Sequence, residues 1–341
     1  MRKLISAVSA LALLGVLFMA WLFGAPVTKG YEGTRSITIR RGESFAAVVE
    51  TLVDRGILKA ERRFRFAATI TGWHRQVKPG HYAIAAGISN HDLLEKLRKG
   101  LQTPLRVTIP PGSRPSVVAA VLRRDLDIDS TAFRLALDDD SLLSDLGTDA
   151  DHVFGYIMPE TFEFFWGTGA RQVVTRLKKS YDSYFSSERM ARAEALNLTR
   201  DDVLILASIV EWEARLDEER PTIAGVYLNR IRINMPLQAD PTVQYALMQL
   251  EGGRMRRLLF EDYKLQHPYN TYLYYGLPPG PITNPSPASV DAVLFADDHN
   301  YLYFVADGSG GHTFSSTIGE HNRAAATYRR LMRQRRREQG D

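Results

Sequence analysis

An uncharged stretch of twenty residues, "LISAVSALALLGVLFMAWLF" (residues 4–23), is the feature that most constrains the fold of this 341-residue chain. As an α-helix rising about 1.5 Å per residue, it is about 30 Å long, which matches the hydrocarbon core of a bilayer. Arg2 and Lys3 precede it, and basic residues favour the cytoplasmic side. The sequence therefore predicts a cytoplasmic stub (residues 1–3) and a transmembrane anchor (residues 4–24).

A cleaved signal peptide is the alternative interpretation of this stretch. The apolar run is longer than the core of a signal peptide, and the best cleavage position, after Ala25, has Pro26 behind it and bulky Phe23 two residues before it. We therefore expect an uncleaved single-pass protein of the inner (plasma) membrane. No other stretch of the sequence is long and apolar enough to span a bilayer, so the remainder is expected on the extracytoplasmic, or periplasmic, side.

The next seventy residues have the pattern of a small α+β module. Ile37 and Ile39 alternate as in a half-buried strand, and "KPGHYAI" is typical of a turn that leads into a second strand. Two apolar runs between them have helical spacing, and "SNHDLLEKLRKG" has the Ser cap and terminal Gly of a short helix. The sequence predicts a strand–helix–helix–strand module with one added helix over residues 34–104.

A weak internal repeat links this module to the segment that follows it. Five residue types recur after a shift of seventy positions: Thr38, Ile39, Gly42, Val48 and Leu52 match Thr108, Ile109, Gly112, Val118 and Leu122. Both copies predict a strand, a glycine turn and an amphipathic helix. The pattern is compatible with chance and with a repeated wall-binding half-module.

Aromatic residues gather in "FGYIMPETFEFFWGT", on both sides of Glu160. Aromatic side chains at this density are typical of a core, but rings also stack on the apolar faces of sugars. Glu160 is therefore a candidate substrate-binding residue.

The charge totals exclude few classes of function. The formal net charge is +4, and six arginines gather near the C-terminus, so residues 331–341 are predicted to be a basic tail. Such a tail can contact an anionic polymer or lipid, or it is a solvated helix end; we expect no nucleic-acid partner. The chain has no cysteine, which excludes a thiol nucleophile and a cysteine metal site. His312 and His321 lack a third ligand at zinc-like spacing, so we predict no metal and no cofactor.

The central segment "LILASIVEWEARLDEERPTIAGVYLNR" (residues 204–230) places an acidic residue at the end of a buried helix. Thr199 and Asp202 predict a capping box at its start, and residues 203–210 are almost entirely apolar. Glu211 continues the stripe of Leu204, Ala207 and Ser208, whereas Glu213 is rotated by about 200° and is expected to face elsewhere.

Two interpretations of Glu211 remain open at this point. It can be a structural group that pairs with a buried arginine, of which Arg230 is the candidate. Alternatively, a carboxyl held against hydrocarbon has a raised pKa, which suits a general acid that protonates a glycosidic oxygen near neutral pH.

A second carboxylate, Asp240, lies in "MPLQADPTVQYAL". Because Pro241 disfavours the helical conformation at Asp240, this residue can be extended, with Gln238 on the same side and the Thr242 hydroxyl nearby. Asp240 can equally be the N-cap of a helix that begins at Pro241.

The segment "HPYNTYLYYGLPPGPITNPSPAS" predicts a long surface loop, and such loops are often functional. Tyr269, Asn270 and Tyr272 offer stacking and amide hydrogen bonds to a sugar, although the loop can also be a proline-stiffened connector. "YLYFVADGSGGHTFSS" predicts a hairpin with His312 on its returning strand.

Taken together, these motifs resemble the endolytic murein transglycosylases of the MltG (YceG-like) family. The resemblance rests on "PGHY", "GYIMPET", "LASIVEWEA", "EERPTIAGVYLNR", "LQADPTVQYA", "YNTYLYYGLPPGPITNPS" and "YLYFVADGSGGHTFSST", and it extends to about residue 330. It implies a LysM-like module at residues 34–104 and a mixed α/β catalytic domain at residues 105–330. It also places the catalytic glutamate at Glu211, the first of a Glu-x-Glu pair, and Gln238, Asp240 and Thr242 in the cleft wall. Trp212 departs from the family, which often has lysine there.

The resemblance implies cleavage of the β-1,4 bond between MurNAc and GlcNAc inside nascent glycan strands. The expected product is a 1,6-anhydro-MurNAc end, with Glu211 acting first as acid and then as base and with Asp240 as a positioning or electrostatic residue. Peptidoglycan strands are the expected partner, together with peptidoglycan synthases. The alternatives are a hydrolase that admits water at the same site and a non-catalytic wall-binding tether that recruits synthases.

Overall fold

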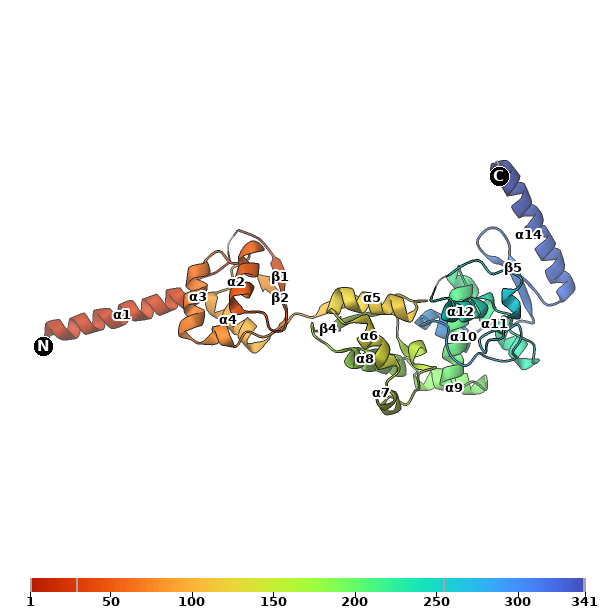
Figure 1. Cartoon of the computed structure of the whole chain (residues 1–341), viewed down its shortest axis with the longest axis horizontal. Helices are drawn as coiled ribbons and strands as arrows, with labels where there is room; N and C mark the ends of the chain where they lie inside the picture. Colours follow the sequence, from red (N-terminus) through yellow and green to blue (C-terminus); the bar gives the residue numbers. More distant parts are fainter. Residues whose placement is uncertain (1, 29, 254, 340–341) are drawn as a thin grey trace. The chain divides into compact units, whose positions relative to one another are not determined.

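The computed structural model describes residues 2–28, 30–253 and 255–339. Its contacts divide the chain into two compact units, which are described separately (Figure 1). The first is Met1–Val107 with Arg124–Asp127 and Glu163–Thr168. The second is Thr108–Arg123, Ile128–Phe162 and Gly169–Asp341.

The first unit begins with α1 (Arg2–Gly24), which confirms the predicted apolar helix. Among the described residues, one segment, Ile5–Gly24, is long and apolar enough to cross a membrane, and 6% of it is buried. Its last turn is the exception to that exposure, because Leu22 is 1% exposed and belongs to the core of this unit.

The rest of the first unit follows the predicted element order. Its elements are β1 (Thr34–Ile39), α2 (Phe45–Asp54), α3 (Glu61–Ile70), a 3₁₀ turn η1 (Trp73–Arg75), β2 (Gly80–Ala85) and α4 (Asn90–Lys99). β1 and β2 pair antiparallel, with Ile37 opposite Tyr82, and both of these side chains are buried. The alternation of Ile37 and Ile39 therefore marks the face of the hairpin that packs on the helices.

Local sequence signals set the ends of these helices. The Ser44 and Ser89 side chains accept hydrogen bonds from the backbone N–H groups of Ala47 and Asp92, so each serine satisfies a free donor of the first turn. Gly100 ends α4 in the left-handed conformation (φ 70°), which glycine adopts without steric cost. The caps predicted at Ser89 and Gly100 are confirmed.

From residue 105 onward the chain is a mixed α/β assembly in which helices predominate. Two short strands, β3 (Leu105–Thr108) and β4 (Thr161–Phe164), pair with each other, as do β5 (Tyr303–Ala306) and β6 (His312–Ser315). The longer helices are α5 (Pro115–Leu126), α8 (Ala170–Tyr184), α10 (Arg200–Glu213), α11 (Arg220–Arg232), α12 (Asp240–Leu250) and α14 (Ile318–Gln339). The shorter elements are α6 (Ser130–Leu137), α7 (Asp140–Asp145), η2 (Val153–Tyr156), α9 (Ser187–Ala195), η3 (Asp217–Glu219), η4 (Asp262–Lys264) and α13 (Pro287–Leu294).

Several predictions for this part of the chain are confirmed. The turn at Gly112 has φ 61° and lies between β3 and α5, so it repeats the order of strand, glycine turn and helix seen around Gly42 (φ 78°). Four of the clustered aromatics are buried, namely Phe154, Tyr156, Phe162 and Phe164, whereas Phe165 is 54% exposed. The predicted basic tail continues α14 as far as Gln339, and its last two residues lie outside the described residues.

Helix α10 is the centre of the second unit (Figure 1). Thr199 and Asp202 form the predicted capping box, and every residue from Val203 to Val210 is buried. α10 packs against α13, α11, α12, α9 and η2. Apolar residues on all sides of the helix are therefore covered by other elements, and its polar end is held in a fixed place.

The long loop between η4 and α13 is attached to this core by buried hydrogen bonds. The Ser208 hydroxyl accepts from the Ile282 N–H at 3.0 Å. The side chain of Asn284 is fully buried; its oxygen accepts from the Ser113 N–H at 2.7 Å, and its amide donates to the carbonyls of Pro110 and Ile157 at 3.1 Å each. Asn284 thus joins three backbone segments that are distant in sequence.

We predict that Asn284→Ala destabilises the protein by about 3 kcal/mol or more, because it leaves an N–H and two carbonyls buried without partners. The measurement is urea denaturation of the full chain in detergent. Asn322→Ala, at an exposed position on α14, is the control and is expected to change little. Equal midpoints for the two variants would contradict the role assigned to Asn284.

Candidate active site

A groove of about 1290 Å³ lies around the C-terminal end of α10, within the second unit. We call it the α10 groove. Its acidic residues are Glu211, Glu213 and Asp240, and its basic residues are Arg114, Arg215, Arg256, Arg257 and Arg335. Trp212, Phe260, Tyr263, His312 and Tyr328 add rings to its walls.

Glu211 lies at one side of the groove, and its Oε2 atom accepts four hydrogen bonds. The donors are the Ser286 N–H (3.0 Å), the Ser286 hydroxyl (2.6 Å), the Ser289 hydroxyl (2.7 Å) and Arg220 Nη1 (2.8 Å). The side chains of Glu211 and Arg220 are 6% and 13% exposed. Glu211 therefore ties the end of α10 to the first residue of α11 and to the N-cap of α13.

This environment contradicts the expected raised pKa of Glu211. Burial raises the pKa of this carboxyl, but the hydrogen bonds from Ser286 and Ser289 and the charge of Arg220 outweigh burial and hold the pKa below its usual range. The pairing with an arginine is present, although the partner is Arg220 and not the expected Arg230. A carboxylate with four donors is stable as an anion, so it is poorly suited to give up a proton.

Glu213 has the properties expected of Glu211. Burial and the nearby negative charge of Asp240 raise its pKa from 4.5 to about 7, against an opposing effect of Arg230. Among the described residues it has no ion-pair or hydrogen-bond partner for its carboxyl. Glu213 has different neighbours from Glu211, as expected, although both residues line the groove at the end of α10.

Asp240 lies in the groove as the first residue of α12, with Ala239 as the N-cap. Its carboxylate does not cap the helix; Oδ1 accepts a hydrogen bond from the Tyr272 hydroxyl at 2.6 Å. Tyr263 packs on Tyr272 with ring centroids 4.6 Å apart, and burial, followed by the charge of Asp240, raises the pKa of Tyr263 to about 12. Asp240 and Tyr272, which the sequence indicated separately as candidates, are therefore in direct contact.

Arg230 is the positive charge that acts on Glu213. It is buried, and its Nε and Nη1 atoms donate to the carbonyls of Leu302 and Leu237 at 2.7 Å each. Since these partners are neutral, the charge of Arg230 remains available to stabilise Glu213 in its ionised form.

Two predicted substrate-binding residues are fully buried and lie outside the groove lining. Thr242 donates its hydroxyl to the Ala239 carbonyl at 2.8 Å and lies 2.9 Å from the Thr271 hydroxyl. Asn270 donates to the carbonyls of Tyr263 and Leu265 and accepts from the Tyr272 N–H. Their polar atoms are used in hydrogen bonds that hold the loop next to Asp240 and Tyr272. The prediction that these two residues contact the substrate directly is therefore corrected.

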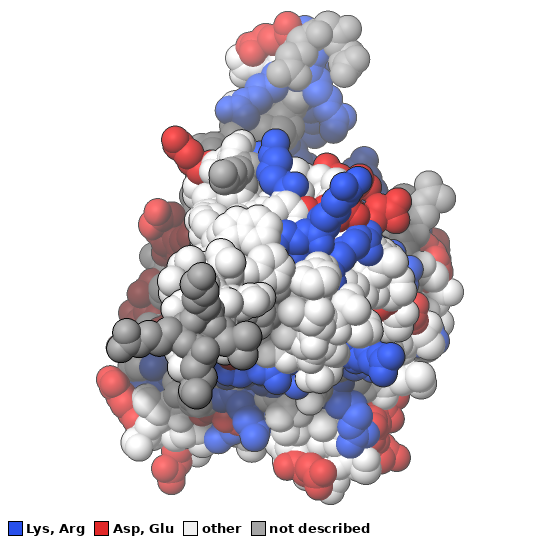
Figure 2. Space-filling view, turned by 90° about the vertical axis from the view of Figure 1, so that its left-hand side faces the viewer, with Lys and Arg blue, Asp and Glu red and all other residues white. Residues whose placement is uncertain are grey.

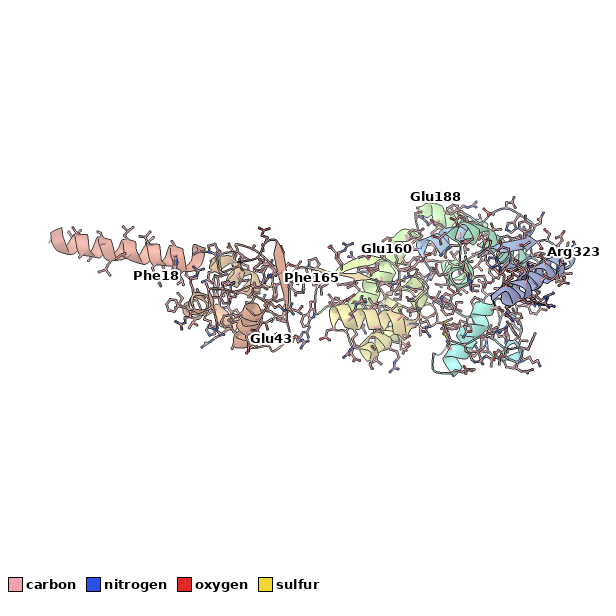
Figure 3. All side chains as sticks on the ribbon, turned by 90° about the horizontal axis from the view of Figure 1, so that it is seen from above. Phe18, Glu43, Glu160, Phe165, Glu188 and Arg323 are labelled. Atoms are coloured by element: carbon pink, nitrogen blue, oxygen red, sulfur yellow. The ribbon has the colours of Figure 1, made fainter. Side chains whose placement is uncertain are left out.

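The other predicted residues have different positions. Gln238 has φ 47°, so the segment is not extended as expected; its side chain is exposed and does not line the groove with Asp240. Tyr269 is 8% exposed, and its ring lies at a tilted angle 4.7 Å from that of Tyr245. Glu160 is exposed (Figure 3) and is not part of the groove lining. His312 lines the groove, where its Nδ1 atom lies 2.7 Å from Glu219 Oε2.

Three residues that matter here were not singled out from the sequence, namely Arg220, Ser286 and Ser289, and no role was predicted for Trp212. The serines in "NPSPAS" have the spacing of an N-cap and its third residue, which predicts a helix start and hence free N–H donors. Trp212 Nε1 donates to the Gly112 carbonyl at 2.9 Å, and no local pattern indicates that contact. In the part of the chain that the structure describes, no group of three or more His, Cys, Asp or Glu is placed to hold a metal ion.

Comparison with known proteins identifies the family of the chain. The model of the YceG-like family matches residues 37–327. The chain belongs to the YceG-like family. An endolytic murein transglycosylase of Bacillus subtilis strain 168 is 30% identical over 329 residues, which cover 91% of this chain and 90% of that relative.

More distant relatives share the same region. An endolytic murein transglycosylase of Streptococcus pneumoniae strain D39 is 27% identical over 89% of this chain, which spans 60% of that longer protein. The crystal structure of a yceG-like protein from Listeria monocytogenes has a TM-score of 0.59 and 27% identity, and the match covers 85% of this chain and 98% of that one.

The two glutamates are expected to have opposite effects on stability. Folding raises the pKa of Glu213 from 4.5 to about 7, so ionising it costs stability as the pH rises through this range, and Glu213→Gln removes that cost. Folding lowers the pKa of Glu211, so its contribution is present above its ordinary pKa and is lost as the pH falls. At a pH of about 8, Glu213→Gln should unfold at higher urea than the parent, and Glu211→Gln at lower urea.

Urea midpoints measured from acidic to alkaline pH test this contrast, with Glu218→Gln, at an exposed position, as the control. Both differences should shrink as the pH falls below the ordinary pKa of glutamate. A Glu213→Gln variant that is less stable than the parent at alkaline pH would refute the assignment.

Proposed function

We propose that this protein is a membrane-anchored endolytic lytic transglycosylase of peptidoglycan, with Glu213 as its acid and base. The observation that carries the proposal is a carboxyl of pKa about 7 beside Asp240 in an open groove. The names of the B. subtilis and S. pneumoniae relatives support the substrate class.

The first step is breakage of the bond between C1 of MurNAc and the O4 atom of GlcNAc. A carboxyl of pKa about 7 is protonated in about half of the molecules at neutral pH, so Glu213 can donate its proton to the leaving O4. The positive charge that develops at C1 lies near the carboxylate of Asp240, which Tyr272 holds in place.

The second step closes the anhydro ring. The ionised Glu213 takes the proton from the 6-hydroxyl of the same MurNAc, and O6 forms the new bond to C1. The proton that left Glu213 is replaced, and no water is consumed. Because the nucleophile is already attached to the sugar, this step gains from proximity.

Glu211 is the alternative acid, which the family resemblance indicates. Its four donors and lowered pKa favour a different role, in which it fixes the last turn of α10 and hence the position of Glu213. The aromatic residues of the groove, Trp212, Phe260, Tyr263 and Tyr328, offer faces on which sugar rings can stack.

The organisation of the chain fits this activity. We propose an anchor at residues 4–24, a LysM-like wall-binding module at residues 34–104, a catalytic domain at residues 105–330 and a basic tail at residues 331–341. The anchor would hold the enzyme in the inner membrane with its groove on the periplasmic side, where nascent strands leave their synthases. Gln238, Glu160, Tyr269 and His312 remain candidate contacts for parts of the strand outside the cleavage point.

We predict that Glu213→Gln lowers cleavage of purified glycan strands by about a thousandfold, because the amide can neither donate nor accept the proton. Glu211→Gln keeps an acceptor oxygen for the same donors, so the fraction that remains folded should lose much less cleavage than Glu213→Gln does. Mass spectrometry of the new ends is the measurement.

Each other outcome has a defined meaning. Loss of cleavage in folded Glu211→Gln with retention in Glu213→Gln would return the catalytic role to Glu211. Ends heavier by one water molecule would indicate a hydrolase. If the parent protein produces no new ends, the remaining interpretation is a non-catalytic wall-binding tether that recruits synthases.

The rate should also depend on pH through Asp240. Its negative charge helps to raise the pKa of Glu213, so Asp240→Asn should move the alkaline limb of the pH–rate profile to lower pH. The profile is measured with the same strand assay, and Asp298→Asn, outside the groove lining, is the control. An unchanged limb in Asp240→Asn would show that the two carboxyls do not interact.

A further inference from the structure

The last turn of α1 is fixed to the first unit and does not project freely from it. Leu22 is buried in the core of the unit, and Asn90 Nδ2 donates to the Leu22 carbonyl at 2.8 Å. Arg63 on α3 donates to the carbonyl of Ala25 at 3.1 Å. The direction of α1 therefore sets the orientation of the module that follows it.

Helix α3 lies beside the end of α1 (Figure 1). The rings of Phe18 and Phe66 are 6.4 Å apart in an edge contact, and the Arg63 guanidinium lies 5.2 Å from the Trp21 ring. Between the two helices is a hollow of about 580 Å³. It is lined by Phe18, Trp21, Leu22, Lys59, Ala60, Glu61, Arg62, Arg63 and Phe66.

The contact between Phe18 and Phe66 indicates how deep α3 would lie in a bilayer that α1 crosses. Phe18 precedes Gly24, the end of the apolar span, by six residues, or about 9 Å of helix. If Ile5–Gly24 crosses the hydrocarbon core, the ring of Phe66 lies below the outer boundary of that core. An amphipathic helix in a bilayer interface buries its apolar face to about the same depth, 5–10 Å.

The outer face of α3 has the composition of such a helix. Arg62, Phe66 and Ile70 follow one another at helical spacing, and Phe66 and Ile70 are each 49% exposed. Arg65 pairs with Glu61, but Lys59 and Arg62 have no ion pair within the described part of the chain. Figure 2 faces the end that carries α1, and both basic and acidic side chains border the uncharged surface in this view.

We propose that the outer face of α3 docks on the bilayer surface and that the hollow between α1 and α3 receives the headgroup of an anionic phospholipid. Phe66 and Ile70 enter the acyl boundary, and Lys59 and Arg62 contact the headgroup phosphates. This inference rests on the proposed membrane anchoring, but it is independent of the proposed chemistry in the groove. Docking would hold the first unit against the membrane in a single orientation.

The test uses the full chain in vesicles of phosphatidylcholine with phosphatidylglycerol. Because the chain has no cysteine, single variants Ile70→Cys and Arg41→Cys can each carry one environment-sensitive fluorophore. Arg41 is the matched control; it is exposed and close in sequence to Glu43, which lies away from Phe18 (Figure 3). The label at residue 70 should be quenched by brominated lipid and protected from iodide, and the label at residue 41 should show the reverse.

The contribution of the headgroup is tested by charge reversal. The double variant Lys59→Glu with Arg62→Glu should lower the equilibrium constant for docking by about fivefold for each of the two basic residues replaced. The loss is measured as reduced quenching of the label at residue 70. Arg40→Glu with Arg41→Glu is the control and should leave the quenching unchanged. Replacing phosphatidylglycerol with phosphatidylcholine alone should reproduce the effect of the first pair.

Two results would overturn the inference and can be told apart. A chain that floats with vesicles but exposes residue 70 to iodide as fully as residue 41 is anchored without docking. A chain that does not float with vesicles at all refutes the anchoring as well. Neither result bears on glycan cleavage, which is measured without a membrane.

Discussion

The arrangement of the second unit depends on the hydrogen bonds that Glu211 accepts. One carboxylate oxygen receives four donors from Arg220, Ser286 and Ser289, so three helices meet at a single charge. Burying an ionised group is costly unless its partners replace the lost water, and here donors from α11 and from the start of α13 do so. The position of the last turn of α10, and with it the groove, follows from this contact.

Two carboxyls two residues apart therefore have different electrostatic environments. Glu211 is surrounded by donors and a cation, whereas Glu213 is buried near the negative charge of Asp240, which the favourable charge of Arg230 only partly offsets. The helix supplies this difference, because consecutive odd positions near its end face different neighbours. A pair of this kind separates the group that maintains the structure from the group whose proton is mobile.

Much of the fold could be predicted from local patterns in the sequence. The caps at Ser89 and Thr199, the β1–β2 hairpin and the buried α10 all depend on residues within a few positions of one another. The environment of Glu211 could not be predicted, because its donors lie 9, 75 and 78 residues away. The apolar sequence around Glu211 indicated a raised pKa, and only the tertiary contacts show that serine hydroxyls and Arg220 reverse it.

The same distinction explains why two residues were wrongly predicted to bind substrate. Thr242 and Asn270 have side chains suited to sugar binding, but here those side chains form hydrogen bonds with backbone carbonyls near the turn at Gln238 and in the loop after η4. The loop that contains Tyr272 is attached at Thr271, Ile282 and Asn284 to residues of three other segments. A loop attached at so many points has little conformational entropy left to lose, so Asp240, which Tyr272 contacts, would meet a long polymer in a position fixed beforehand.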